Sequence, residues 1–194
     1  KFTALSRAKT FGQRLGAMAA FRPSDFAPII GLKLGLADPV AGLNMGQTAE
    51  NLARDFNIRR EEQDAFALKS HQRATAAKSL LREEMTPVFV AGSKKNHVLG
   101  DNGVRENQTL EALGKLKPVF ERNHGTVTAG NASQITDGAV AMLVMTESRA
   151  EELGLEPLGR LIDYRYSGCD PARMGLGPAH SIAELKTATG LAPE

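Results

Sequence analysis

A run of small residues constrains the fold of this chain more than any other feature. Residues 125–139 (GTVTAGNASQITDGA) are almost all small, turn-forming or short polar residues, and they lead directly into the apolar run 140–145. Small residues let a backbone approach a ligand or another backbone closely. We therefore expect this stretch to form the wall of a site that leads into a buried strand, rather than a surface loop.

The composition is that of a globular protein. The chain has 194 residues, of which 42% are hydrophobic and 24% are charged, and it is long enough for one large domain. The sequence contains no apolar run of the ~18 residues that a membrane span requires. The single cysteine, Cys169, excludes an internal disulfide framework, and four scattered histidines without a second cysteine give no structural zinc site, so no metal is expected.

Charge is distributed unevenly along the chain. Residues 1–43 carry six basic residues against two acidic ones, a net charge of +4, whereas the remainder is slightly acidic. Such a basic segment with apolar residues fits either an anionic membrane surface or a solvated face whose apolar side packs on the rest of the protein. No nucleic-acid motif accompanies the charge, so no nucleic-acid partner is predicted. The apolar residues concerned are Phe11, Leu15, Met18, Phe21, Phe26, Ile29 and Ile30.

Hydrophobic periodicity predicts a mixed α/β chain. Helices are expected at 3–20, 48–56 (capped by Thr48), 60–82, 109–116, 147–153 (with a Ser148–Glu151 capping box) and 179–189. Strands are expected at 85–91, 126–129, 140–145 and 158–166. The strand–helix–strand order over 140–166 predicts an α/β layer structure, with the helix-rich residues 1–120 forming an attached subdomain.

Several side chains are candidates for ligand contact, and each also has a purely structural interpretation. Asn131 and Ser133 suit a hydrogen-bonding wall for a polar group such as an amide, or a turn that bonds its own backbone. Arg105 suits a phosphate clamp or a surface charge. Met45 and Met174, each beside glycine, suit flexible apolar contacts with a ligand or ordinary core filling.

No nucleophile can be argued from spacing. Cys169 has no neighbouring base in the sequence and is expected to be a small buried thiol. The four histidines give no Ser/His/Asp or Cys/His set.

Five motifs, in order and in register, resemble those of the thiolases. They are MGQTAEN at 45–51, REEQDAFA at 60–67, KLKP at 115–118, the small-residue stretch at 125–139, and GCDP at 168–171 with MGLGP at 174–178. The resemblance covers residues 43–190. The basic segment before it and SHQRA at 70–74 are most similar to the β-subunit type of the fatty-acid oxidation complex.

The resemblance implies an α/β, thiolase-type αβαβα fold, of which this chain holds the helix-rich loop domain and the junction of the two halves. Residues 1–125 would be the loop domain, with 1–43 as its basic apolar segment. Residues 126–157 would end the N-terminal half, and residues 158–194 would begin the C-terminal half. Because the first residue is not methionine and the chain stops just after a helical run, we expect an internal fragment of a longer protein.

The resemblance also implies acyl transfer between a β-ketoacyl-CoA or acetyl-CoA and coenzyme A through a cysteine thioester. The family's catalytic cysteines and histidine would lie outside this chain. Coenzyme A would be a substrate, and no cofactor is implied. The residues expected to contact coenzyme A or the acyl group are Asn44, Met45, Arg105, Ala132, Ser133, Ile135 and Met174.

Two positions depart from the family pattern. Asn44 stands where relatives often have histidine, and Arg59 stands where many have a helix-capping serine. Loss of such a cap costs about 1 kcal/mol unless another residue, such as Asn57, substitutes for it.

The resemblance extends to partners and location. It implies a homodimer or homotetramer, or a hetero-oligomeric β-oxidation complex, in the bacterial cytoplasm or in mitochondria, with peripheral membrane contact through 1–43 as a further option. The alternative function is a non-catalytic, thiolase-like subunit that binds coenzyme A or another protein. A chain with half of each sheet missing should expose apolar faces.

Overall fold

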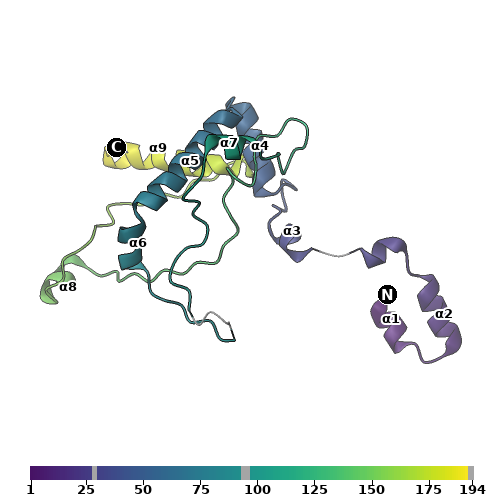
Figure 1. Cartoon of the computed structure of the whole chain (residues 1–194). Helices are drawn as coiled ribbons and strands as arrows, with labels where there is room; N and C mark the ends of the chain where they lie inside the picture. The colour runs from purple at the N-terminus through teal and green to yellow at the C-terminus, as the bar shows by residue number, and fades with distance from the viewer. Residues whose placement is uncertain (28–29, 93–96, 192–194) are drawn as a thin grey trace. The chain divides into compact units, whose positions relative to one another are not determined.

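The computed structural model describes residues 1–27, 30–92 and 97–191 (Figure 1). The chain divides into two compact units, Lys1–Ala37 and Asp38–Glu194, and each unit is described by itself. Ile29, one of the apolar residues of the basic segment, lies outside the described residues.

The first unit consists of short helices: α1 (Phe2–Arg7), α2 (Phe11–Ala19), the 3-10 helix η1 (Pro23–Phe26) and α3 (Gly31–Gly35). The single helix predicted over 3–20 is wrong, because Thr10 starts a new helix. The Thr10 hydroxyl accepts the Gln13 backbone N–H at 3.3 Å, and the Gln13 side chain accepts the Thr10 N–H at 3.2 Å. This reciprocal capping box favours a helix start over a continuing turn.

The Asp25 side chain connects the N-terminal residue to the 3-10 helix of the first unit. Its carboxylate accepts hydrogen bonds from the Lys1 ammonium and from the Arg22 backbone N–H, each at 2.7 Å. The Lys1 hydrogen bond is the main reason why the pKa of Asp25 lies below its ordinary value. In the same unit, the Phe21 and Phe26 rings stack with centroids 5.5 Å apart.

The second unit contains α4 (Met45–Asp55), α5 (Arg60–Ala76), α6 (Lys78–Glu84), α7 (Leu110–Gly114), α8 (Glu147–Glu152), the 3-10 helix η2 (Pro171–Leu176) and α9 (Gly177–Thr189). Helix α4 packs against η2, α5 packs against α7, and α9 packs against η2. Figure 1 shows α8 reached through long non-helical traces on both sides. Among the described residues, no helix of the chain is both long and apolar enough to cross a bilayer.

Helix α4 is capped by Asn44 and begins at Met45, three residues before the predicted start at Thr48. Its side chain accepts the Gln47 N–H at 3.0 Å, and the Gln47 side chain accepts the Asn44 N–H at 3.0 Å. Thr48, the predicted cap, is buried inside the helix and donates its hydroxyl to the Met45 carbonyl at 2.8 Å. Asn57 adopts a left-handed conformation with φ of 52° just beyond the helix, as expected for a residue that ends it.

The long helix predicted at 60–82 divides into α5 and α6 at Ala77, whose ψ of 6° is not helical. Periodicity cannot reveal this break, since alanine is the strongest helix former. At the start of α5, Arg59 offers no side-chain acceptor, and Glu62 accepts the Arg59 N–H at 2.8 Å. Glu62, rather than Asn57, therefore compensates for the missing serine.

The predicted helix ends at 153 and 189 lie within one residue of the observed ends of α8 and α9. Gly154 and Gly190 have φ values of 63° and 72°, the left-handed conformation that ends helices α8 and α9. The predicted Ser148 cap is wrong by two residues, because the Thr146 hydroxyl accepts the Arg149 N–H at 3.3 Å and α8 begins at Glu147.

The four predicted strands are wrong as hydrogen-bonded elements. Across the described residues, strand-like pairing occurs only as isolated bridges, among them Val88 with Val98 and Pro118 with Thr128. The apolar segments 140–145 and 158–166 run without ladder partners, and their side chains are exposed, as Leu143 (87%) and Tyr166 (88%) illustrate. A strand requires a neighbouring strand to satisfy its backbone, and the described residues supply none for these segments. The expectation of exposed apolar surface is met here.

Candidate functional site

Buried polar side chains, rather than a large apolar core, hold the small-residue stretch in place. The buried apolar residues among those described are few: Ala53, Leu113, Val127 and Ala150. Glu50 of α4 is buried, and its carboxylate accepts the backbone N–H groups of Thr126 (3.0 Å) and Val127 (2.9 Å). It also accepts the Thr126 hydroxyl at 3.1 Å. Charge-assisted bonds of this kind are stronger than neutral ones, so Glu50 fixes residues 126–127 to α4.

A second anchor joins the stretch to α5. The buried Asp64 carboxylate accepts the Asn131 side-chain amide at 2.9 Å, and it pairs with Arg60 at 2.8 Å. Arg60 also donates to the Leu113 carbonyl at 2.7 Å. The Asn131 side-chain oxygen Oδ1 accepts the Thr128 N–H at 2.7 Å. Asn131 therefore has the structural role that the sequence left open, a turn that bonds its own backbone, and it also connects that turn to α5.

We call residues 126–131, held by Glu50 and Asp64, the anchored turn. Close packing reinforces it, since a Cβ added at Gly130 would lie 2.5 Å from Leu116 and 2.6 Å from Leu113. Gly130 is thus a position where backbone and side chains approach closely, as the small-residue composition predicts.

The chain leaves the anchored turn after Asn131 and is exposed from Ser133 onward, whereas Ala132 is half-buried. The Ala132 N–H donates to the Thr128 carbonyl at 3.1 Å. The Ser133 side chain is exposed, and its hydroxyl makes only a long 3.4 Å bond to the Gln134 carbonyl among the described residues. Ile135 is 71% exposed. A rigid turn thus presents one hydroxyl and one apolar side chain to the surroundings.

Arg105 lies on a loop that touches the same region. The Gln134 side-chain amide donates to the Gly103 carbonyl at 3.0 Å, which joins the loop to the residue next to Ser133. The Arg105 N–H donates to the His71 imidazole Nδ1 at 3.2 Å. The Arg105 side chain is exposed, and within the described part of the chain its guanidinium forms no ion pair. Its charge is therefore available to a ligand.

Met45 and Met174 belong to the packed pair α4 and η2. The Asn51 side chain donates to the Ala172 carbonyl at 3.1 Å, and a Cβ added at Gly175 would lie 2.6 Å from Leu52. Met45 and Met174 themselves are 51% and 45% exposed, so neither is simple core filling. The structure thus places Asn44, Met45 and Met174 on one pair of elements.

The structure therefore gathers the predicted residues into two groups. Arg105 joins Ala132, Ser133 and Ile135 through the bond between Gln134 and Gly103, whereas Asn44, Met45 and Met174 lie along α4 and η2. Sequence reasoning missed the side chains that hold the first group: Glu50, Asp64, His71 and Gln134. For Glu50 the available signal was a carboxylate on the buried face of α4, since Glu50 lies three residues before the buried Ala53.

Cys169 takes no part in either group as a reactive thiol. It is half-buried, and its Sγ donates to the Met174 carbonyl at 3.8 Å. The adjoining Asp170 accepts the Ala172 N–H at 3.0 Å and pairs with Arg173 at 2.7 Å, and both contacts lower the pKa of Asp170. These bonds give the 169–174 turn a structural role. No cluster of three or more histidine, cysteine or acidic side chains suited to a metal ion occurs in the described ranges.

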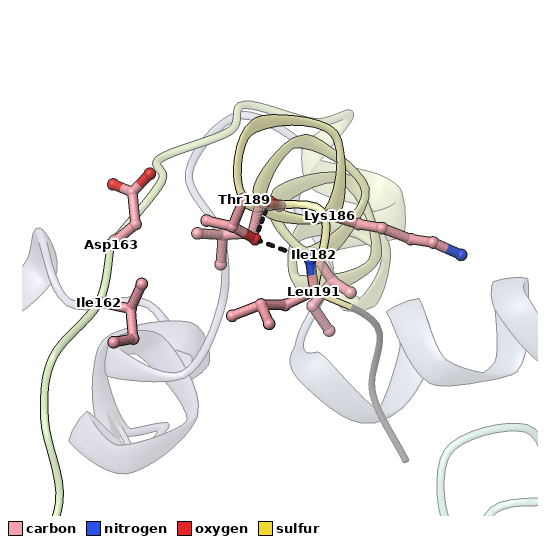
Figure 2. A pocket seen from close by; sticks show the side chains of 7 residues that line it. Ile162, Asp163, Ile182, Lys186, Thr189 and Leu191 are labelled. Atoms are coloured by element: carbon pink, nitrogen blue, oxygen red, sulfur yellow. Dashed lines mark hydrogen bonds between the residues drawn. The ribbon is translucent and has the colours of Figure 1, made fainter.

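Two hollows are present in the second unit, and one of them borders the loop that carries Arg105. One, of about 300 Å³, is formed by α9 and by Ile162 and Asp163 of an exposed segment (Figure 2). In Figure 2 the apolar side chains of Ile182 and Leu191 face Ile162, while the Lys186 ammonium points away. The second, of about 280 Å³, lies between α5, α6 and the loop that precedes Arg105. Neither hollow is lined by a predicted site residue.

The sequence of this chain matches that of a known protein family. The sequence profile of the thiolase N-terminal domain matches residues 16–148. A 3-ketoacyl-CoA thiolase of Escherichia coli (strain SMS-3-5 / SECEC) is 45% identical over 190 residues, and one of Shigella flexneri serotype 5b is 44% identical. Each match covers 96% of this chain and 43% of the relative, so the chain spans less than half the length of these relatives.

Solved structures of proteins with related sequences also superpose on this chain. Human mitochondrial 3-ketoacyl-CoA thiolase in complex with CoA superposes with a TM-score of 0.75 at 40% identity, over 88% of this chain and 45% of that one. Bacillus anthracis acetyl-CoA acetyltransferase gives a TM-score of 0.76 at 38% identity, over 83% of this chain and 41% of that one. The fold is thus one that this chain shares with solved thiolase structures. The chain belongs to the thiolase family, and the predicted thiolase-type α/β fold is confirmed.

Proposed function

We propose that the protein to which this chain belongs transfers acyl groups between a 3-ketoacyl-CoA or acetyl-CoA and coenzyme A. Support comes from the relatives, which are named as 3-ketoacyl-CoA thiolases and as an acetyl-CoA acetyltransferase. We place the catalytic cysteines and histidine outside this chain, because its single cysteine bonds to a turn carbonyl. A cysteine thioester divides the transfer into acylation of the enzyme and capture of the acyl group by coenzyme A.

Within that reaction, we propose that this chain supplies part of the wall that binds coenzyme A. The observation that carries this proposal is the anchored turn. Buried carboxylates from two helices hold residues 126–131, and the next residues present an exposed Ser133 hydroxyl. A rigid support that offers a free hydroxyl suits recognition of an amide, such as those of pantetheine, because little conformational freedom is lost on binding.

The remaining predicted residues take complementary roles. Ala132 and Ile135 flank Ser133 and offer apolar contact to the pantetheine arm. Arg105, whose guanidinium forms no ion pair with the residues that the structure describes, suits the phosphates of the nucleotide end. Met45 and Met174, both about half exposed, would line the acyl path with adaptable thioethers.

Asn44 contributes differently from the other site residues. Its side chain is engaged in the capping box of α4, so its contribution to the site is to hold Met45 rather than to contact the ligand directly. This role follows from the departure of Asn44 from the family's histidine.

The test uses the protein in its complete natural length and its thiolysis of acetoacetyl-CoA. Ser133→Ala should raise the KM for coenzyme A about fivefold, because one hydrogen bond worth roughly 1 kcal/mol is lost, and should leave kcat nearly unchanged. Ser148→Ala, at an exposed serine on α8, is the matched control. Coenzyme A binding without thiolysis would favour the non-catalytic alternative, and absence of both would refute the proposal.

A second candidate function, membrane contact, concerns the first unit alone. Phe11, Leu15 and Met18 lie on one face of α2 and are 82%, 58% and 60% exposed, within a segment of net charge +4. We propose peripheral contact of this face with anionic lipid. Vesicles containing phosphatidylglycerol should co-sediment the protein, and Leu15→Ser should weaken that binding. Equal sedimentation with neutral phosphatidylcholine vesicles would contradict it.

The next proposal concerns how the protein assembles and where in the cell it lies. We propose a homodimer or homotetramer, either alone or within a hetero-oligomeric β-oxidation complex, in the bacterial cytoplasm or in mitochondria. The exposed apolar segments 140–145 and 158–166 support association with further protein surface. Light scattering on the complete protein tests it, because a monomer would exclude the assembly.

A further inference from the structure

The loop that carries Arg105 is held by three side chains from three different places. Residues 103–106 lie between α6 and α7, and none of these four residues is helical. The Gln134 amide donates to the Gly103 carbonyl at 3.0 Å, and the Lys78 ammonium pairs with Glu106. The third contact, from the Arg105 N–H to His71 Nδ1 at 3.2 Å, holds the backbone of Arg105 itself from a helix, whereas the Arg105 carbonyl accepts the Gln108 N–H at 3.2 Å from within the same loop.

His71 is well suited to hold that backbone. It lies near the C-terminal end of α5, is half-buried, and accepts the amide through Nδ1, so its own proton lies on Nε2. The helix that carries it is itself fixed, since Arg60 bonds to the Leu113 carbonyl and Asp64 bonds to Asn131. A backbone held from a fixed helix presents its side chain from a defined place.

One helix therefore positions both segments of the first group. Asp64 holds the anchored turn that precedes Ser133, and His71 holds Arg105. The two residues are seven apart, which in an α-helix places them on the same face about 10 Å apart along the axis. Helix α5 thus sets the spacing between a hydroxyl and a cation that would meet different parts of one extended ligand.

We propose that His71 is a positioning residue, which holds the Arg105 backbone so that its guanidinium meets the nucleotide end of coenzyme A. This inference rests on the proposed function. His71 does not touch the ligand, and it acts by accepting one main-chain hydrogen bond. A purely structural role would instead affect the whole fold and every ligand alike.

The experiment compares three substitutions in the protein of complete natural length. His71→Asn keeps an acceptor oxygen where Nδ1 lies, whereas His71→Gln moves the acceptor one bond further out and His71→Leu removes it. Calorimetry measures binding of coenzyme A and of pantetheine, which lacks the nucleotide. We expect His71→Leu and His71→Gln to weaken coenzyme A binding about five- to tenfold with pantetheine unaffected, and His71→Asn to stay within about twofold of the wild type.

A double substitution completes the test. Arg105→Ala should weaken coenzyme A binding by itself, and adding His71→Leu should bring little further loss, because the two residues act through one contact. The inference alone is overturned if His71→Leu binds coenzyme A like the wild type while Arg105→Ala does not. It is also overturned if all three His71 variants weaken coenzyme A and pantetheine equally. A wild type that binds no coenzyme A refutes the proposed function, and this inference with it.

Discussion

The anchored turn and the segment 140–145 lie close to each other in the sequence, but their surroundings differ completely. Val127 is 7% exposed in the first, whereas Val144 is 82% exposed in the second. The second segment is the more apolar of the two, so hydrophobicity does not explain the difference. The two segments differ in their hydrogen-bond partners. Two buried carboxylates bind the anchored turn, whereas the described residues contain no strand that pairs with segment 140–145. In this chain, specific polar anchors decide which segment is packed.

Glu50→Ala should cause the largest loss of stability. Removing the carboxylate leaves the Thr126 and Val127 N–H groups without their buried acceptor, and we expect the free energy of unfolding to fall by about 3 kcal/mol. Urea unfolding followed by far-ultraviolet circular dichroism measures this. Glu121→Ala is the control, because Glu121 forms only an exposed pair with Arg54 and should cost less than about 0.5 kcal/mol. Equal losses in the two variants would show that Glu50 is not an anchor.

Amide hydrogen exchange should separate the two regions directly. The N–H groups of Thr126, Val127 and Thr128 donate to buried side chains, so we expect them to exchange at least about 30-fold more slowly than those of residues 140–145 in this 194-residue chain. Mass spectrometry of peptic fragments measures the difference. Similar rates in the two regions would contradict the comparison. In the complete protein, residues 140–145 should gain protection if further strands pair with them.

A pair of glycine substitutions should sharpen the contrast. Gly130→Ala should destabilise the chain by about 1–3 kcal/mol, because the added methyl group would lie within 2.6 Å of the Leu113 and Leu116 side chains. Gly138→Ala should have an effect within about 0.5 kcal/mol, since no atom lies within 4 Å of the place that its methyl group would take. Thermal unfolding of both variants provides the measurement. A loss at Gly138 as large as that at Gly130 would mean that the segment after the anchored turn is packed as tightly as the turn.

Local signals allowed much of the helical part to be predicted. Helix α9 ends at Gly190 and α8 ends before Gly154, as expected, because a left-handed glycine terminates a helix whatever the tertiary context. The predicted helix starts were less accurate, because residues that could each cap a helix lie close together in the sequence. Asn44 and Thr48, for example, are both good capping residues, and only the reciprocal bond with Gln47 decides between them.

Strands and site supports could not be predicted in the same way, because both depend on residues distant in sequence. The apolar pattern of 140–145 describes a strand, but pairing requires a partner that the pattern does not contain. The contact between Arg105 and His71 joins residues 34 apart, and that between Glu50 and Val127 joins residues 77 apart. The site residues themselves came from the family resemblance, and their contacts with coenzyme A stay predictions.

The smallest expected effect concerns acid stability at the start of α5, the helix that supports the anchored turn. The Arg59 N–H donates to the Glu62 carboxylate, and this bond is the main reason why the pKa of Glu62 lies below its ordinary value of 4.5. A carboxyl group with a lowered folded pKa stabilises the fold above its unfolded pKa, and this contribution is lost as the pH falls through the folded value. Glu62→Gln keeps an acceptor oxygen but does not titrate. The wild type should therefore exceed Glu62→Gln in stability at pH 7 by more than it does at pH 3, as measured by urea unfolding at both values. Asp25, Glu106 and Asp170, whose pKa values are also lowered, are present in both proteins and cancel in the difference. A difference that does not change with pH would show that the Glu62 carboxylate does not stabilise the start of α5, and the anchored turn would then depend on α5 through Gln63 and Asp64.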